Sequence, residues 1–185
     1  SVPVSAPTRR TAALSVVAVV ANDNGGTREV PDFPLFVDAL PVTSGQRLSM
    51  APGPHHVSGG PSGGYAVTVG GDCAADGSIV LAPRSERTCA LTYDDEPSVI
   101  RVISVVVNDD GGTKQADDVR ILVDGGRATA GTELTVPAGT HNVSTPEDPL
   151  YTHTVSGDCG PGGQIVLTPG QSKTCTLTSD DRTPH

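Results

Sequence analysis

Four cysteines are the residues of this chain with the clearest capacity for covalent chemistry. They fall in two similar stretches, as the pair Cys73 and Cys89 and the pair Cys159 and Cys175. Paired thiols can form disulfides or bind zinc, but neither pair has the C-x-x-C spacing of a zinc knuckle. We therefore expect two disulfides, each within its own stretch, with zinc as the alternative. Disulfides in turn predict a secreted protein, extracellular or on the cell surface.

Acidic clusters offer a second kind of chemistry. "NDNGG" begins at Asn22 and "NDDGG" at Asn108, and aspartate pairs stand at Asp94–Asp95 and Asp180–Asp181. Carboxylate and carbonyl oxygens are calcium ligands, but this spacing is not that of an EF-hand loop. Tight turns need the same Asn, Asp and Gly residues. We expect turns here, and neither a metal nor another cofactor, with calcium as the alternative.

The chain shows no pattern of a known catalytic site. It has no nucleophile elbow, zinc-protease motif or phosphate-binding loop, so the sequence predicts no enzyme. Five histidines are present, among them His55, His56, His141 and His153, and they are expected to be solvated in turns and polar strands. A glycosylation sequon begins at Asn142 and is interpreted as a chance match.

The cysteines and aspartates recur because the chain repeats itself. A shift of 86 residues superimposes it on itself without a gap, and 35 of the 82 positions aligned from Leu14 to Asp95 are identical. "VGGDC" meets "VSGDC", and "TCALTYDD" meets "TCTLTSDD". A repeat of this length indicates a duplicated domain rather than a solenoid. We expect domains at residues 14–96 and 97–185, preceded by an extended arm at residues 1–13.

Short strands separated by turn residues are expected in each repeat. The chain contains 22 Gly and 16 Pro, and alternation such as Cys-Thr-Leu-Thr favours half-buried strands. Seven strands in about 85 residues predict an all-β protein of two tandem immunoglobulin-like or prealbumin-like β-sandwiches. In the first repeat they are expected near Leu14–Ala21, Phe33–Ala39, Arg47–Met50, His55–Ser58, Tyr65–Val69, Ser78–Leu81 and Arg87–Tyr93.

The apolar run Leu14–Ala21 follows two arginines and resembles the core of a signal peptide. The same run recurs inside the chain at Ile100–Asp110, where no export signal could work. Both runs are therefore expected to be strands, and any signal peptide to have been removed or to lie outside this sequence.

Charge and composition exclude several partners. The net charge is −9 and the basic residues are scattered, which argues against nucleic acid and anionic membranes. No apolar run reaches the roughly 20 residues of a membrane span. With no Trp and few other aromatic residues, exposed platforms for carbohydrate are not expected.

Several stretches together resemble a known family. "VVVNDDGGT", "DFPLFVD" and "SGDCGPGGQIVLTPGQSKTCTLTSDD", with Tyr65 and Tyr151, are similar to the prealbumin-like, Cna B-type (SpaA-like) domains of microbial surface proteins. The resemblance covers nearly the whole chain. It implies β-sandwich modules strung in tandem on adhesins, stalks and pilus-like fibres.

Many members of that family carry a Lys–Asn isopeptide bond assisted by a buried acid. The resemblance implies positions for the lysine, the acid and the asparagine, and none of the three residue types is present there in either repeat. Glu147 lies two positions from the implied acid. The disulfide would then be the remaining covalent lock. The implied positions are Ala18 and Ser104, Gly59 and Thr145, and Tyr93 and Ser179.

The arm suggests how such a module could assemble. It belongs to neither repeat, Val2 and Val4 alternate, and Pro3 and Pro7 oppose a helix. A strand of this kind can add to the sheet edge of a neighbouring copy, so Val2 and Val4 are expected at a subunit interface of a homopolymer. One alternative is an adhesin fragment that binds an unknown surface ligand. Another is that the arm is only a disordered tail or linker.

Overall fold

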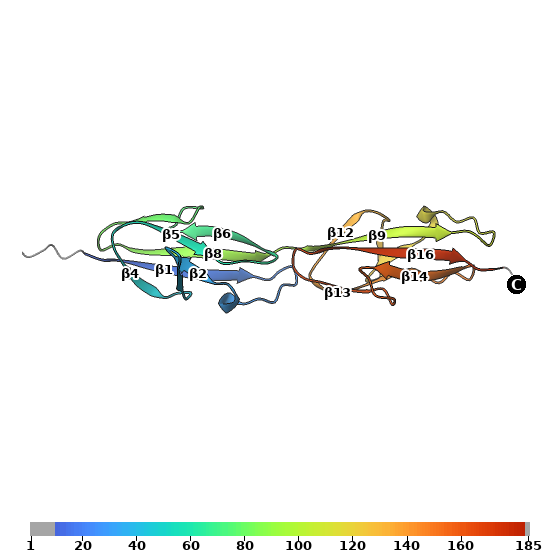
Figure 1. Cartoon of the computed structure of the whole chain (residues 1–185), viewed down its shortest axis with the longest axis horizontal. Coiled ribbons are helices and arrows are strands. Elements are labelled where there is room, and N and C mark those ends of the chain that lie inside the picture. The colour runs from blue at the N-terminus through green and yellow to red at the C-terminus, as the bar shows by residue number, and fades with distance from the viewer. Residues whose placement is uncertain (1–9, 184–185) are drawn as a thin grey trace, which may run out of the picture. The chain divides into compact units, whose positions relative to one another are not determined.

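The computed structural model describes residues 10–183, and Figure 1 labels its elements. The described chain forms two compact units, the first made of residues 10–22 and 27–95 and the second of residues 23–26 and 96–183. The two sequence repeats are described separately below. Nearly all regular structure is β, which confirms the expected fold class of two tandem β-sandwiches. Val2 and Val4 lie outside the described residues. Among the described residues, no helix has the length and apolarity to cross a membrane.

The first repeat contains two four-stranded sheets, in the orders β4-β1-β8-β6 and β3-β2-β5-β7. A 3-10 turn, η1 (Val30–Asp32), precedes β2. The strands are β1 (Ala12–Ala21), β2 (Leu35–Val37), β3 (Leu40–Val42), β4 (Arg47–Met50), β5 (Gly53–Gly59), β6 (Tyr65–Gly71), β7 (Ser78–Leu81) and β8 (Glu86–Asp95).

The second repeat has the same arrangement, in the orders β12-β9-β16-β14 and β11-β10-β13-β15. Its 3-10 turn is η2 (Ala116–Asp118). The strands are β9 (Ser98–Val107), β10 (Ile121–Val123), β11 (Gly126–Ala128), β12 (Glu133–Val136), β13 (Gly139–Ser144), β14 (Tyr151–Gly157), β15 (Gln164–Leu167) and β16 (Ser172–Asp181).

The first and last strands of each repeat are parallel neighbours. β1 pairs with β8 from Ala13↔Glu86 to Ala21↔Asp94, and β9 pairs with β16 in the same way. These apolar runs are therefore strands, as expected. β1 begins at Ala12, two residues earlier than predicted, and Ala12 and Ala13 are buried. The expected arm of residues 1–13 thus overlaps a core strand at its end.

Each repeat has one strand more than the seven expected. Leu40–Val42 forms β3, which returns antiparallel on β2 through the two-residue turn Asp38–Ala39. Both turn residues have positive φ, as do Asp124 and Gly125 in the second repeat. This is the turn geometry that matches the twist of a two-stranded hairpin. The sequence analysis expected one strand at Phe33–Ala39 and none at Leu40–Val42, so it placed the turn residues inside a strand and missed β3.

The space between the two sheets of each repeat is filled by alternate side chains of their strands. β8 and β16 bury every second residue, with Leu91 and Leu177 fully enclosed. The first core contains the ring stack of Phe33 on Tyr93, with centroids 4.0 Å apart. The second core has neither ring, because Val119 and Ser179 stand at these positions.

Each repeat contains one disulfide. It lies where the antiparallel pairing of β6 with β8, or of β14 with β16, ends. Cys73 bonds to Cys89 and Cys159 to Cys175, with Cα atoms 5.1 and 5.2 Å apart. Each bond joins the second residue beyond β6 or β14 to the fully buried cysteine of β8 or β16. The described chain contains no free cysteine, so the pairing leaves no thiol for zinc.

Replacing Cys73 and Cys89 together by serine should lower the free energy of unfolding of the first repeat by about 2–5 kcal/mol, because the cross-link restricts the unfolded chain. Urea unfolding measures this, and the Cys159 and Cys175 double variant is the matched control for the second repeat. Unchanged unfolding curves for both variants would contradict the assigned role of the bonds.

Candidate functional site

The N-D-x-G-G-T loop, the tyrosine that both repeats share and the terminal aspartates form one hydrogen-bonded unit, here called the loop knot. In the second repeat, Tyr151 Oη donates to Asn108 Oδ1 over 2.8 Å and accepts from the Lys114 amide over 3.1 Å. Asn108 Nδ2 donates to the Lys114 carbonyl over 2.8 Å, which closes the ring. In the first repeat the same three bonds measure 2.7, 3.2 and 3.0 Å and involve Tyr65, Asn22 and Arg28.

Asp181 is the centre of the loop knot in the second repeat. Its carboxylate accepts main-chain hydrogen bonds from Asp109, Asp110 and Gly112, at 2.5–3.1 Å. Burial alone would raise the pKa of this carboxyl, but the three amide donors outweigh it and the net pKa is lowered. The "DD" at the end of β16 therefore holds the turn through its second aspartate.

The two glycines of this loop have different tasks. Gly111 has φ +94°, a backbone conformation that disfavours side chains. A Cβ on Gly112 would stand 2.5 Å from Tyr151 Oη and 2.8 Å from Asn108 Oδ1. The first glycine makes the turn, and the second leaves room for the tyrosine and asparagine to meet.

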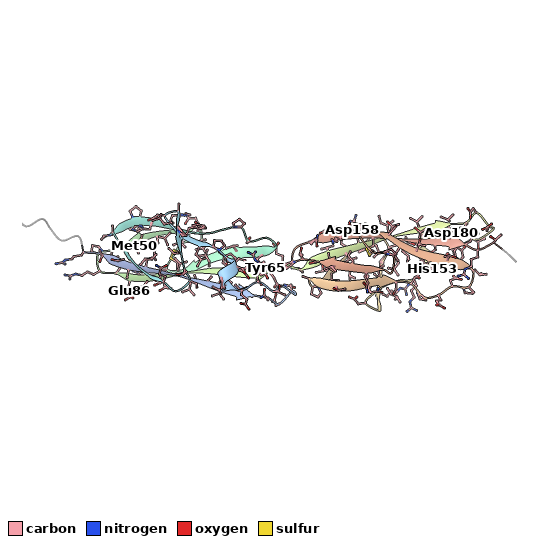
Figure 2. The ribbon with its side chains drawn as sticks, turned by 60° about the horizontal axis from the view of Figure 1, so that its bottom comes forward. Met50, Tyr65, Glu86, His153, Asp158 and Asp180 are labelled. Atoms are coloured by element: carbon pink, nitrogen blue, oxygen red, sulfur yellow. A yellow bond between two sulfur atoms is a disulfide. The ribbon has the colours of Figure 1, made fainter. Side chains whose placement is uncertain are left out.

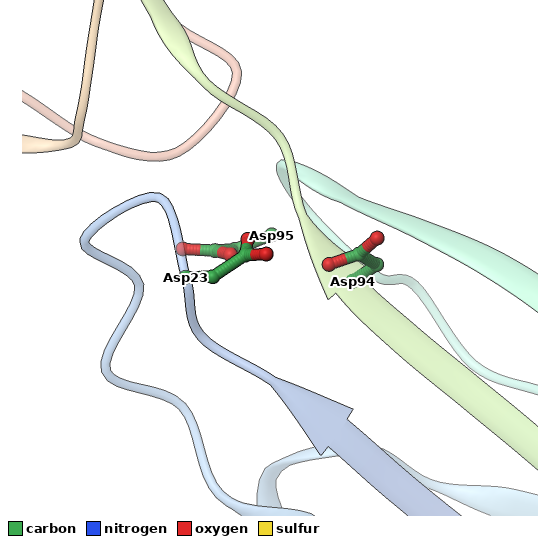
Figure 3. A group of neighbouring side chains, drawn as sticks. All are labelled: Asp23, Asp94 and Asp95. Atoms are coloured by element: carbon green, nitrogen blue, oxygen red, sulfur yellow. The ribbon is translucent and has the colours of Figure 1, made fainter.

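The carboxylates of the loop and of the end of β16 lie close together. One carboxylate oxygen from each of Asp109, Asp180 and Asp181 lies within 4.8 Å of the others. Desolvation, followed by repulsion from Asp180 and Asp110, raises the pKa of Asp109. One carboxylate oxygen from each of the equivalent residues Asp23, Asp94 and Asp95 also lies within 4.8 Å of the others. Figure 3 shows these three side chains. Because amides already occupy both oxygens of Asp181, the geometry accounts for this residue as a turn cap.

The paired histidines are not solvated, contrary to the sequence interpretation. His55 Nδ1 lies 2.7 Å from Asp38 Oδ2, and its Nε2 lies 2.7 Å from the Ala51 carbonyl. His141 contacts Asp124 and the Pro137 carbonyl at 2.6 and 2.8 Å. Only 11% and 8% of the two histidine side chains are exposed. Each pair joins the hairpin turn to β5 or β13.

Both ring nitrogens of these histidines face acceptors, which favours the imidazolium form. The hydrogen bond to Asp38 and then that to Ala51 raise the pKa of His55. For His141 burial lowers the pKa, but the bonds to Asp124 and Pro137 outweigh it. An Nε2 held by a main-chain carbonyl is not placed to activate a nucleophile, in contrast to a catalytic triad.

The sequon asparagine has a structural partner. Asn142 Nδ2 donates to the Gly162 carbonyl over 3.2 Å, and at the equivalent position His56 Nε2 lies 2.9 Å from the Asp76 carbonyl. Both side chains therefore bridge to the turn before β15 or β7. Asparagine and histidine thus make the same contact, a side-chain hydrogen bond to a main-chain carbonyl of that turn.

The positions that the family resemblance implies for an isopeptide bond are taken by other contacts. Tyr93 is fully buried, and a Cβ on Gly59 would collide with its hydroxyl, so the glycine makes room for the ring. This hydroxyl has no hydrogen-bond partner among the described residues, and burial raises its pKa. In the second repeat, buried Ser179 contacts His153 Nδ1 at 2.9 Å. The isopeptide chemistry of Cna B-type domains has no side chains to support it here.

A hollow of about 640 Å³ lies beside the start of β14. Its lining includes Thr145, Glu147, Thr152, His153 and Arg182. Figure 2 labels His153, together with Asp180 on the neighbouring strand β16. The sequence interpretation did not find this hollow, because its residues come from a loop, an edge strand and the end of the chain.

No protein-family model and no curated protein sequence matches the chain. Among solved structures it is similar to the Bacillus anthracis TIE protein, with a TM-score of 0.53 and 12% identity over 93% of this chain. The chain spans 34% of that protein's length. This likeness shows the fold alone.

Two pilins align at lower TM-scores. The major pilin T-13 of Streptococcus pyogenes has a TM-score of 0.35 and 11% identity, over 94% of this chain and 97% of its own. The minor pilin GBS52 of Streptococcus agalactiae has a TM-score of 0.32 and 10% identity, over 94% and 98%.

Gly112→Ala should destabilise the second repeat by about 1–3 kcal/mol, because the added methyl group forces the loop knot apart. Thermal unfolding measures the loss. Gly162→Ala is the matched control, since nothing lies within 4 Å of a Cβ there, and it should unfold like the unsubstituted chain. Equal stability of the two variants would contradict the packing described for Gly112.

The His–Asp pairs predict a stability that depends on pH. Because the folded pKa of His55 and His141 is raised, their contribution is fully present below the unfolded value of about 6.5. It is lost as the pH rises through the folded pKa. The pKa of Asp38 and that of Asp124 are lowered, so their contribution is present above about 3.9 and lost in stronger acid.

Burial lowers the pKa of His153, so its effect is confined to pH values below about 6.5. Melting temperatures measured between pH 6.5 and 9 should therefore fall toward the alkaline end. The double variant His55→Gln and His141→Gln should flatten that slope, while the control His56→Gln should keep it. A slope that survives in the double variant would assign the pH dependence to other groups.

Proposed function

We propose that the chain is a structural subunit of an extracellular filament, pilus-like fibre or surface stalk. Its copies assemble by adding the N-terminal arm of one subunit to a sheet edge of the next. The observation that carries this proposal is one edge strand in each repeat, at the edge of the sheet that contains the parallel strand pair. β6 and β14 are seven residues long and contain neither charge nor proline among Tyr65–Gly71 and Tyr151–Gly157. Such edges pair readily with another strand.

The covalent and hydrogen-bonded cross-links of each repeat support a mechanical role outside the cell. A disulfide closes each sandwich, and the loop knot fixes the ends of the central strands. Such bonds are stable in an oxidising compartment. A mechanical role needs no catalytic site, and we propose no catalysis.

A second candidate function is ligand binding by an adhesin fragment. The hollow beside β14 favours it, since polar and charged side chains, among them Glu147, His153 and Arg182, converge there. This alternative requires a monomer with a saturable ligand.

The full-length chain should form filaments at high concentration, visible by electron microscopy. Removing residues 1–10 should leave a monomer with an unchanged melting temperature, because the deletion stops before buried Ala12 and Ala13. Removing residues 184–185 from the other end is the control and should leave assembly intact. A full-length chain that stays monomeric at high concentration would overturn the filament proposal.

A further inference from the structure

The sheet edges of the second repeat differ in how well they are protected. β12 has four residues, and Arg101 of its neighbour β9 pairs with Glu133 beside this edge. β11 has three residues, one of which is Arg127. On β15 the Gln164 carbonyl accepts the Gly160 amide and the Val166 carbonyl accepts Lys173 Nζ. Shortness, charge and filled acceptors are the features that discourage pairing with another chain.

β14 is protected only at its start, where the Tyr151 amide donates to the Asp148 carbonyl over 3.3 Å. It is antiparallel to β16 from Tyr151↔Asp181 to Gly157↔Cys175. The Arg182 amide bonds the Leu150 carbonyl at 2.9 Å and the Asp158 amide bonds the Thr174 carbonyl at 3.0 Å. In an antiparallel ladder the hydrogen-bonded pairs alternate, so the even-numbered residues of β14 face β16. The amides and carbonyls of His153 and Val155 point to the free side.

In the first repeat, β6 shares this alternation, but its surroundings differ. The loop before β14 carries Glu147 and Asp148, where the loop before β6 has Pro61 and Ser62. Glu147 is exposed and lines the hollow beside β14. Asp148 is already paired with Lys114. An added strand that carries basic residues at one end would therefore find one acidic partner, Glu147, in the loop before β14 and none in the loop before β6.

The arm has the sequence features of such a strand. In an extended chain alternate residues turn their amides to the same side, so Val2, Val4 and Ala6 face one way. Pro3 and Pro7 both face the other way, where their missing amides remove no bond to the acceptor and discourage a further strand. Seven residues extend over roughly 23 Å, which is the length of β14.

Arg9 and Arg10 give this strand a direction. If it runs antiparallel to β14, they follow its last paired residues and arrive beside Tyr151, where the exposed Glu147 lies. Asp148 already forms an ion pair with Lys114, and Arg182 lines the same hollow, so Glu147 is the acidic partner that the arm would meet. Opposite charges beside a strand pair stabilise that register and orientation. An antiparallel arm also continues the antiparallel pairing of β14 with β16.

From these observations we propose that β14 is the acceptor edge, and that residues 2–8 of a neighbouring copy add to it antiparallel through the free main-chain groups of His153 and Val155. This assignment rests on the proposed filament function and names the partner surface within it. The occupant is a second copy of this chain.

Val155→Pro tests the edge directly. It removes an amide that faces the free side and leaves the bonds to β16 in place. The matched control is Val69→Pro at the equivalent position of β6, since both valines are partly buried against their cores. Circular dichroism and melting curves establish that both variants fold. Electron microscopy should show filaments for Val69→Pro and none for Val155→Pro.

The donor strand has its own matched pair. Val4→Pro removes an amide on the acceptor side and should abolish filaments, whereas Ser5→Pro changes the outer side and should retain them. An equimolar mixture of Val4→Pro and Val155→Pro chains should give a 1:1 complex of twice the monomer mass by light scattering. The Val155→Pro chain still donates its arm, and the Val4→Pro chain still offers its β14 edge. The complex cannot grow, because the remaining arm and the remaining edge both carry a proline substitution.

The outcomes separate the two proposals. If the unsubstituted chain makes no filaments, the proposed function fails and the acceptor edge fails with it. If filaments form and Val69→Pro abolishes them while Val155→Pro does not, the edge is β6 and this inference is wrong. If neither substitution affects them, or if the mixed variants remain monomers, assembly uses another contact and the assignment to β14 is overturned.

Discussion

The parallel pairing of the first and last strand is the constraint on which the rest of each repeat depends. β9 and β16 lie side by side over nine residue pairs, as β1 and β8 do. This pairing places the end of β16 beside the loop that follows β9, so that Asp181 reaches the amides of that loop. It also puts these two strands in the middle of their sheet and leaves β14 at its edge. The loop knot and the free edge are both consequences of that order.

Much of the fold could be predicted from the sequence because the repeat displays each pattern twice. Arg47–Met50 and Ser78–Leu81 are strands with the predicted bounds. β3 was missed because Ala39 gave no turn signal, although Asp124–Gly125 at the same place in the second repeat is a strong one. Comparison of the two repeats therefore locates this turn, since Asp124–Gly125 aligns with Asp38–Ala39.

The contacts of the candidate site were less predictable, since they join residues far apart in the chain. Asp38 meets His55 across 17 positions, and Asp124 meets His141 at the same separation. The one sequence signal of this contact is that both the aspartate and the histidine occur at equivalent positions in the two repeats. The loop motif was correctly interpreted as a turn, but its partners Tyr151 and Asp181 are brought to it by the sheet. A free edge cannot be recognised without the strand order, so the sequence suggested a donor strand and left its acceptor unknown.

The central claim is that the main chain of β14 is free on one side and becomes paired when copies assemble. Amide hydrogen exchange of individual residues measures this directly. In the dilute monomer the His153 and Val155 amides should exchange faster than those of Thr152 and Thr154, which face β16. In the filament all four should be slow. Protection of His153 and Val155 already in the monomer, or their continued fast exchange in the filament, would contradict the account.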